Sequence, residues 1–309
     1  MRKISIIFFI SFAITLNLSA QLFPEVVSGR LIRHENFHSA FVEPRNIDIW
    51  LPEGYTPENK YAVIYMHDGQ MLFDSSTTWN RHDWEVDETL GRLMSEKKVK
   101  PCIVVGIWNT PKRHMEYFPQ KALNYLSENQ IDSLMNANRG EGTPKLFDGG
   151  IVADNYLKFL VTELKPFIDK TYATHTDSGN TYIMGSSMGG LISMYAICEY
   201  PEVFGGAACL STHWPGVFTV ENNPVPGALL SYLREHLPPP GKHLLYFDFG
   251  TETLDNLYEP FQNHADQILK EKGYGENDWI TRKFVGADHS EKAWSQRLHI
   301  PVMFLLGLD

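Results

Sequence analysis

Short apolar runs alternate with longer helical runs along almost the whole chain, and this alternation constrains the fold more than any other feature. Runs such as YAVIYM and CIVVGI contain few polar residues, which is typical of strands buried on both faces. The alternation predicts an α/β fold, in which helices cover both faces of a mostly parallel sheet. We expect about eight strands, at residues 26–33, 46–51, 61–66, 102–107, 181–185, 207–210, 243–248 and 279–285. We expect helices at residues 84–97, 154–170, 188–199, 259–272 and 291–305.

Three places depart from this alternation. No helix separates the first two expected strands, so we expect them to form an antiparallel edge. The segments 108–150 and 215–241 are rich in polar residues, Pro and Gly, and they are too long for simple connections. Because loops at the carboxyl ends of strands build the sites of such sheets, we interpret 108–150 as a lid or substrate-binding insertion. A solvated excursion is the alternative. Residues 21–309 are expected to form a single domain.

The first twenty residues have the pattern of a signal peptide. Arg2 and Lys3 precede an almost wholly apolar run at residues 4–18, and small residues follow it up to Ala20. A transmembrane anchor is the alternative, but it needs about 20 apolar residues and this run is shorter. We therefore expect cleavage after Ala20, no stable membrane insertion afterwards, and a periplasmic or extracellular protein.

The charge and the cysteines exclude several other classes of protein. The formal net charge is −10, and an acidic chain repels phosphate backbones, so we expect no binding to nucleic acid. The three cysteines are odd in number, which rules out a fully paired disulfide framework. Each lies in an apolar run and none has a metal-ligand spacing to another, so we expect buried free thiols. We expect no metal site and no organic cofactor.

The segment GSSMGG at residues 185–190 contains a G-x-S-x-G pattern centred on Ser187. The pattern alone would arise by chance in roughly one chain in ten of this length. Here it follows the apolar run TYIM and opens the helical run LISMYAICEY, which is the strand–turn–helix setting of a nucleophile elbow. Such a sharp turn needs strained backbone dihedrals and glycines on either side. Ser187, rather than Ser186, is therefore the predicted nucleophile.

A serine hydroxyl needs a base to remove its proton, and in folds with this elbow the base follows the acid in chain order. His289 fits because it follows an expected strand and precedes a helix, whereas His299 lies inside the helix and is the weaker alternative. The acid is expected in the loop GTETLD at residues 250–255, where Glu252 and Asp255 both qualify. We favour Glu252 because it lies nearer the end of the strand.

Backbone N–H groups are expected to stabilise the negative charge that develops on the substrate oxygen. One should belong to Met188, directly after the nucleophile. The other should come from the loop HDGQM at residues 67–71, where Gly69 permits close approach of the backbone. Gln70 and Met71 are both candidates for this second donor.

Together with further motifs, these residues resemble the putative esterase family of α/β-hydrolases, also called the esterase D family. The resemblance covers most of the chain after about residue 40. The motifs are YMHDGQMLFD at 65–74, WEVDETL at 84–90, RHMEYFP at 113–119, IMGSSMGG at 183–190, STHWPG at 211–216, FDFGTETLD at 247–255 and GADHSEKAW at 286–294. The resemblance implies the α/β-hydrolase fold and a triad of Ser187, Glu252 and His289. Many members have Asp just past the Gly-Thr of the acid loop, where this chain has Glu252, so Asp255 stays the alternative acid.

The resemblance also implies where substrate would bind. The motif RHMEYFP is similar to a substrate-side segment of exported bacterial relatives, and STHWPG would lie near the nucleophile. An aromatic platform at Trp214 could stack on a sugar or a phenolic acid, and packing within its loop is the alternative. The candidate substrate-binding residues are His67, Asp68, Arg113, Glu116, His213 and Trp214.

The members of this family include feruloyl and acetyl-xylan esterases, siderophore trilactone esterases, S-formylglutathione hydrolase and mycolyltransferases. A signal peptide fits poorly with the cytosolic hydrolase, and nothing in the chain indicates the envelope lipid that mycolyl transfer needs. The sequence therefore predicts a serine carboxylesterase that forms an acyl-enzyme on small-molecule or glycan esters, carbohydrate-linked acetyl or feruloyl esters above all. The alternatives are a siderophore trilactone esterase, a serine peptidase, and an inactive binding protein on the same fold.

Overall fold

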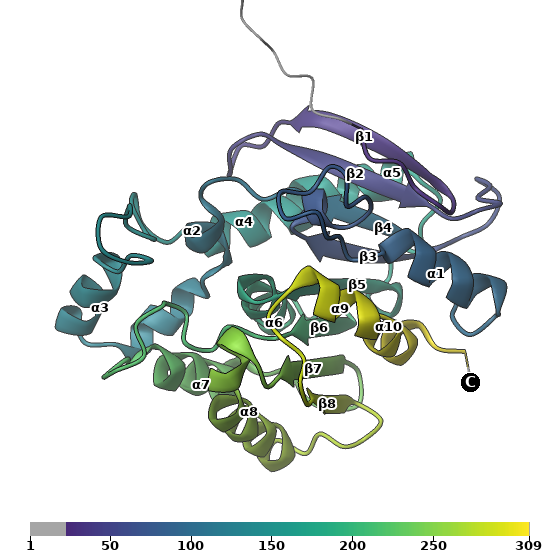
Figure 1. The fold of residues 1–309 in the computed structure, drawn as a ribbon. Coiled ribbons are helices and arrows are strands. Elements are labelled where there is room, and N and C mark those ends of the chain that lie inside the picture. Colours follow the sequence, from purple (N-terminus) through teal and green to yellow (C-terminus); the bar gives the residue numbers. More distant parts are fainter. Residues whose placement is uncertain (1–22, 309) are drawn as a thin grey trace, which may run out of the picture.

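An eight-stranded sheet runs through the middle of the computed structural model (Figure 1), which describes residues 23–308. The predicted signal peptide lies outside the described residues. The strand order is β1-β2-β4-β3-β5-β6-β7-β8. The strands are β1 (Arg30–Phe37), β2 (Arg45–Leu51), β3 (Ala62–His67), β4 (Cys102–Ile107), β5 (Thr181–Ser186), β6 (Gly206–Leu210), β7 (Leu244–Gly250) and β8 (Trp279–Phe284).

The pairing of the strands confirms the predicted fold class. From β4 to β8 all neighbouring strands are parallel, whereas β2 is antiparallel to both β1 and β4. The expected antiparallel edge is therefore present. This is the α/β-hydrolase fold, with a mostly parallel sheet of eight strands and helices on both faces.

The side chains of each central strand alternate between two cores. On β3, Val63 and Tyr65 pack into one core together with α2 to α8, and Ile64 and Met66 pack into the other with α1, α9 and α10. This alternation follows from the two-residue period of a strand, and it explains why these runs are apolar throughout. The helices are α1 (Val86–Ser95), α2 (Arg113–Tyr117), α3 (Glu128–Met135), α4 (Ala153–Phe159), α5 (Lys165–Thr171), α6 (Met188–Glu199), α7 (Val225–His236), α8 (Glu259–Glu271), α9 (Glu291–Arg297) and α10 (His299–Leu306).

The first strand begins later than predicted. It starts at Arg30 rather than at residue 26, because the preceding backbone is held by side chains. The N–H groups of Val27 and Ser28 donate to the Asp87 carboxylate at 2.6 and 3.1 Å, and the Ser28 carbonyl accepts from Trp50 Nε1 at 2.7 Å. These backbone groups are therefore not available for a strand ladder.

Three helical segments also differ from the prediction. The stretch 215–241, expected as an irregular connection, contains helix α7. The expected helix at 291–305 is two helices with a break at Leu298, where Pro301 lacks the N–H that would bond the Arg297 carbonyl. The expected helix at 154–170 contains a π-helical turn, Leu160–Leu164, between α4 and α5.

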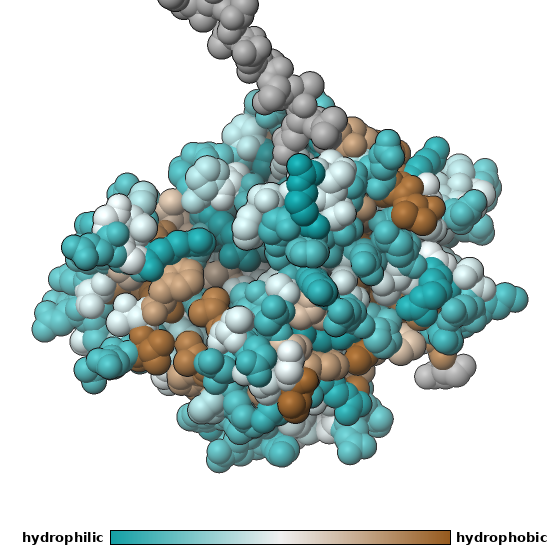
Figure 2. Space-filling view, in the orientation of Figure 1, coloured by the Kyte–Doolittle hydropathy of each residue, from teal (hydrophilic) through white to brown (hydrophobic). Residues whose placement is uncertain are grey.

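The insertion 108–150 contains α2, a 3₁₀ segment and α3, and Figure 1 shows α3 projecting away from the sheet. Figure 2 shows mostly hydrophilic side chains on this face of the molecule, with apolar ones in small, scattered groups. No helix within residues 23–308 combines the length and the apolar character needed to cross a bilayer. The three cysteines are buried and free, which confirms that expectation.

Candidate active site

Ser187 lies at the turn between β5 and α6, in the strand–turn–helix setting that the sequence predicts. Its backbone dihedrals are φ 58° and ψ −120°, a conformation that residues other than glycine rarely adopt. The strain is held by the surrounding chain, because the Ser187 N–H donates to the Leu210 carbonyl at 2.9 Å. Between residues 181 and 198, Ser187 is the one side chain that is not buried. The turn therefore leaves Ser187 partly exposed.

The glycines of the motif allow this turn. A Cβ atom on Gly185 would lie 2.9 Å from the carbonyl carbon of Gly189, which is closer than real Cβ contacts. The end of β5 and the first turn of α6 therefore approach so closely that only glycine fits between them.

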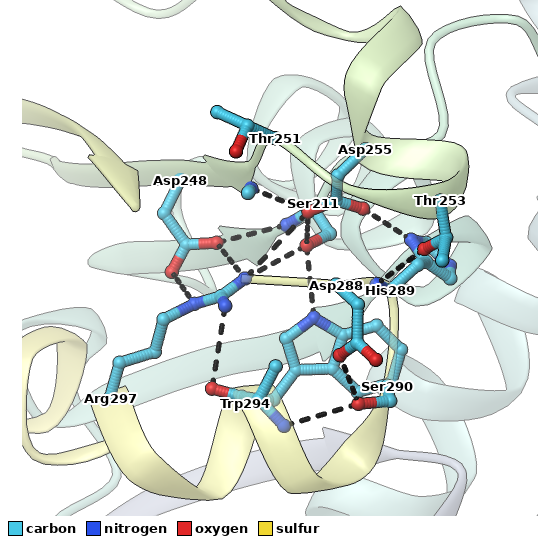
Figure 3. A network of polar contacts seen from close by, with 12 residues as sticks. Ser211, Asp248, Thr251, Thr253, Asp255, Asp288, His289, Ser290, Trp294 and Arg297 are labelled. Atoms are coloured by element: carbon cyan, nitrogen blue, oxygen red, sulfur yellow. Dashed lines mark hydrogen bonds and ion pairs between the residues drawn. The ribbon is translucent and has the colours of Figure 1, made fainter. Parts of the chain in front are cut away.

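His289 lies in the loop between β8 and α9, and its ring contacts a buried carboxylate. Its Nδ1 is 2.6 Å from Asp255 Oδ1 (Figure 3). Its backbone N–H donates to Thr253 Oγ1 at 2.9 Å. Asp255 and Thr253 both belong to a 3₁₀ turn, η5 (Thr253–Leu257), which follows β7. The loop after β7 thus holds both the backbone and the ring of His289.

The structure puts Asp255 rather than Glu252 beside His289, which corrects the favoured assignment. The side chain of Glu252 is exposed, while its backbone N–H donates to the Ala287 carbonyl at 3.0 Å. The reason is the turn itself: Thr253 has φ 54°, and the chain then reverses so that Asp255 points inward. Closeness to the end of the strand was therefore the wrong criterion, and the alternative acid occupies the position.

Asp255 is completely buried, yet it is well supplied with hydrogen-bond donors. Its Oδ2 accepts from the Ser211 hydroxyl and from the Gly250 N–H, each at 2.6 Å. Burial acts to raise the pKa of Asp255. The hydrogen bond with His289 and the charge of that ring oppose it most, and the hydrogen bonds from Ser211 and Gly250 add to this, so the pKa of Asp255 stays below its ordinary value. A carboxylate can only accept, so Nδ1 of His289 must carry the hydrogen and Nε2 is left to act as a base.

Further polar side chains surround this carboxylate (Figure 3). Arg297, from α9, forms a buried two-pronged ion pair with Asp248 of β7, at 3.0 and 3.1 Å. Trp294, also from α9, donates its indole N–H to the Ser211 hydroxyl at 2.9 Å. Sequence reasoning did not single out these residues, although Ser211, Asp248 and Trp294 lie in the motifs STHWPG, FDFGTETLD and GADHSEKAW.

The two candidate donors in the loop after β3 differ in their availability. The Met71 N–H donates to the Asp68 carbonyl at 2.8 Å and closes a 3₁₀ turn, η1 (Gly69–Met71). Gln70 is therefore the better candidate. A Cβ atom on Gly69 would lie 2.5 Å from the backbone of Gly106, so glycine is needed for this loop to pack on β4. Met188 is the first residue of α6, where backbone N–H groups have no partner inside the helix.

Asp68 and Arg113, both expected to bind substrate, bind each other. Arg113 Nε and Nη2 donate to the two oxygens of Asp68, each at 2.7 Å, and Asn109 Nδ2 donates to Oδ1 at 2.6 Å. Burial acts to raise the pKa of Asp68, but Arg113 outweighs it, and Asn109 adds to this, so the pKa is lowered. The Asn109 N–H also donates to Gln70 Oε1 at 3.1 Å. The start of the insertion is thus tied to the loop that carries Gln70.

Two histidines in the site are buried, and each is bonded to a tyrosine. His67 Nδ1 lies 2.8 Å from the Tyr156 hydroxyl, and His213 Nδ1 lies 2.8 Å from the Tyr258 hydroxyl. Mainly through burial, the pKa of each histidine is lowered to about 3, so both are neutral at neutral pH. The Tyr258 ring also packs edge-to-face against the His289 ring, with 5.8 Å between the ring centroids, a contact that no sequence motif indicated.

Two other predicted substrate residues do not reach the site. Glu116 forms a two-pronged ion pair with Arg45 at 2.6 and 2.9 Å, and both side chains are about 1% exposed. Trp214 is fully buried, donates to Gln262 Oε1 at 3.0 Å and stacks on Phe247. The predicted aromatic platform at Trp214 is therefore wrong, and the alternative of packing within the fold is correct.

The chain is similar to known proteins in sequence and in fold. A family model described as "Putative esterase" matches residues 39–300. The uncharacterized protein YbbA of Bacillus subtilis (strain 168) is 24% identical over 272 residues, which cover 85% of this chain and 93% of YbbA. A ferulic acid esterase from Anaeromyces mucronatus, solved in complex with ferulic acid, is 18% identical with a TM-score of 0.57, over 92% of this chain and 93% of that one. Enterochelin esterase from Shigella flexneri is 17% identical with a TM-score of 0.60, and the match covers 92% of this chain and 59% of that one. At these identities, the solved structures support the fold.

Proposed function

Because the chain belongs to the putative esterase family of α/β-hydrolases, we propose that it is a serine carboxylesterase with Ser187 as nucleophile, His289 as base and Asp255 as acid. The observation that carries this proposal is the 2.6 Å contact between His289 Nδ1 and Asp255, with Ser187 on the strained turn that a nucleophile elbow requires. The catalytic acid is proposed as Asp255 in place of Glu252.

The proposed reaction is acyl transfer in two steps. Ser187 Oγ attacks the ester carbonyl carbon while its proton passes to Nε2 of His289. The backbone N–H groups of Met188 and Gln70 would stabilise the negative oxygen, and one such donor contributes about 10²- to 10³-fold in kcat. The tetrahedral intermediate collapses, the leaving alcohol takes the proton from His289, and an acyl-enzyme remains. Water then attacks the acyl-enzyme by the same route and regenerates Ser187.

The proposed substrate is an acyl ester of a carbohydrate, with an acetyl or feruloyl acyl group. The likeness in fold to a ferulic acid esterase supports this choice. The likeness to enterochelin esterase favours a second candidate, a siderophore trilactone. The signal-like composition of residues 1–20 supports export to the periplasm or the outside of the cell, where either ester could be met.

The nucleophile is tested by comparing Ser187→Ala with its neighbour Ser186→Ala. We expect Ser187→Ala to lower kcat/KM for p-nitrophenyl acetate by at least about 10³-fold with an unchanged circular dichroism spectrum. A fluorophosphonate probe should label the wild type and Ser186→Ala but not Ser187→Ala. Hydrolysis at the wild-type rate by Ser187→Ala would remove the basis of the proposal, and absence of labelling and turnover in the wild type would favour the inactive binding protein.

The substrate class is tested with a panel of feruloylated oligosaccharides, acetylated oligosaccharides and a catecholate trilactone. We expect the highest kcat/KM on one of the carbohydrate esters. A preference of about tenfold or more for the trilactone would replace the carbohydrate proposal and leave the serine esterase proposal intact. A matched ester–amide pair separates an esterase from a serine peptidase.

A further inference from the structure

Ser211 is the first residue after β6, and its backbone is strained. It has φ 42°, in the left-handed region that favours glycine. It follows Leu210, which pairs with Asp248 across the sheet, and its N–H donates to the carbonyl of Asp248 at 2.9 Å and to Oδ1 at 3.1 Å. A serine held in this conformation at the edge of an active site indicates that its side chain has a role there.

Within residues 23–308, the hydrogen of the Ser211 hydroxyl has one acceptor to which it can go. The Ser211 Oγ lies 2.9 Å from Trp294 Nε1 and 2.9 Å from Arg297 Nη2. Indole and guanidinium nitrogens only donate, so Ser211 Oγ accepts from both. Its third partner is Asp255 Oδ2 at 2.6 Å, and the hydroxyl must donate to this oxygen. Figure 3 shows Ser211 between the two donors and the carboxylate.

The two donors that orient Ser211 are themselves held firmly. Arg297 is 3% exposed and is fixed by its two-pronged pair with Asp248, whose Oδ2 also accepts from the Tyr246 hydroxyl at 3.0 Å. Trp294 packs edge-to-face against the ring of His289, with 5.0 Å between the ring centroids. Both residues lie on one face of α9, because they are three positions apart in a helix that begins just after His289.

We propose that Ser211 is a positioning residue of the triad, oriented by α9, which fixes the plane of the Asp255 carboxylate so that Oδ1 meets His289 Nδ1. This inference rests on the proposed function. Without the Ser211 hydroxyl, Oδ2 of Asp255 would keep the Gly250 N–H and the charge of Arg297 Nη2 at 4.0 Å but lose its side-chain hydrogen bond, and the carboxylate could rotate about its last bond. The His289 ring would then be held less well in the orientation that receives the proton of Ser187.

Two substitutions separate the hydroxyl of Ser211 from its backbone. Ser211→Ala and Ser211→Gly both remove the hydroxyl, but only glycine adopts φ 42° without strain. We expect both variants to lower kcat about tenfold with KM unchanged, even though Ser211→Gly is the more stable of the two. Ser193→Ala is the matched control, because Ser193 is equally buried and its hydroxyl bonds the Gly189 carbonyl at 2.7 Å, within α6. The control should keep kcat within about twofold.

A measurement without substrate distinguishes this inference from the proposed function. The low-field proton resonance of His289 Nδ1–H, identified by its loss in His289→Gln, reports the contact with Asp255 directly. We expect this resonance to shift in Ser211→Ala and Ser211→Gly and to stay in place in Ser193→Ala. If Ser187→Ala keeps its activity, the proposed function fails, whereas the resonance still reports whether Ser211 acts on Asp255 and His289.

The inference is overturned if both Ser211 variants keep kcat within about twofold of wild type and the resonance does not move, whatever their stability. If neither variant folds, Ser211→Cys takes their place, because a thiol occupies the site but donates only weakly. It should show an intermediate loss of kcat and a shifted resonance. Full kcat with an unmoved resonance in Ser211→Cys would equally overturn the inference.

Discussion

Two groups of carboxylates in this protein are buried or partly buried, and they differ in their charged partners. Asp248 and Asp255, at and after the end of β7, are both fully buried and are bonded to Arg297, Ser211 and His289. A second group, Asp83, Asp87 and Glu88, lies at the start of α1. Within residues 23–308, no lysine or arginine forms an ion pair with any of its three members.

The pKa of Asp255 moves in the opposite direction to those of Asp83 and Glu88. Burial raises the pKa of Asp83 to about 6, and burial with the neighbouring Asp87 raises the pKa of Glu88 to about 7. Burial acts on Asp255 in the same sense, but its hydrogen-bond partners hold its pKa below the ordinary value. For Asp255 the hydrogen-bond partners outweigh burial, whereas for Asp248 burial outweighs the pair with Arg297 and raises the pKa. With its lowered pKa, Asp255 is suited to orient His289, whereas Asp87 in the second group holds the backbone of Val27 and Ser28.

The largest expected effect separates Asp255 from the nearby Glu252. Asp255→Asn should lower kcat about 10⁴-fold, because an amide can hold His289 in the wrong tautomer. Glu252→Gln, two positions past the end of β7 with an exposed side chain, should keep kcat within about twofold. Steady-state kinetics on p-nitrophenyl acetate measure both. A greater loss in Glu252→Gln than in Asp255→Asn would show that the wrong acid has been assigned.

The next largest effect is expected when the cation beside Asp248 is removed, which leaves that carboxylate without an ion pair, as in the group at the start of α1. Arg297→Met leaves Asp248 buried without its partner, which should lower the free energy of unfolding by about 3–5 kcal/mol. Urea denaturation at pH 7 measures this loss. The double variant Asp248→Asn/Arg297→Met should recover part of it, because no unpaired charge remains. A loss below about 1 kcal/mol in Arg297→Met would mean that Arg297 does not neutralise this group.

Local patterns in the sequence predict the parts of the site that depend on neighbours along the chain. The apolar runs predict the buried strands, and the glycines around Ser187 predict its strained turn, because both are properties of a few consecutive residues. His289 follows from its place after the last strand. The exported class was predicted from residues 1–20, and the structure does not describe them.

The rest of the site depends on contacts between residues far apart in the sequence, and local patterns do not predict such contacts. Asp255 rather than Glu252 contacts His289 because Thr253 has a positive φ. The sequence does not predict this conformation, because threonine is not a residue that favours positive φ in turns. Glu116 is buried because Arg45, 71 positions earlier, lies opposite it. Trp214 likewise packs against Gln262, 48 positions later. Such pairs are chosen by tertiary packing, so a motif identified only the chain segment and not the direction of each side chain.

The smallest expected effect tests the second group of carboxylates through the pH dependence of stability. The pKa of Glu88 rises from its ordinary 4.5 to about 7 in the folded protein, so the folded state binds more protons than the unfolded state across that interval. Stability should therefore fall as the pH rises from about 4.5 to 7, and Glu88→Gln should remove this loss. Because Glu88 is about half-buried, we expect a gain of only about 1 kcal/mol at pH 8 and almost none at pH 4. Urea denaturation at the two pH values measures the difference.

Glu96→Gln is the control, since Glu96 at the other end of α1 pairs with Lys98, and its removal should bring no gain at either pH. An equal gain in both variants would mean that a lower net charge, rather than the burial of Glu88, is responsible.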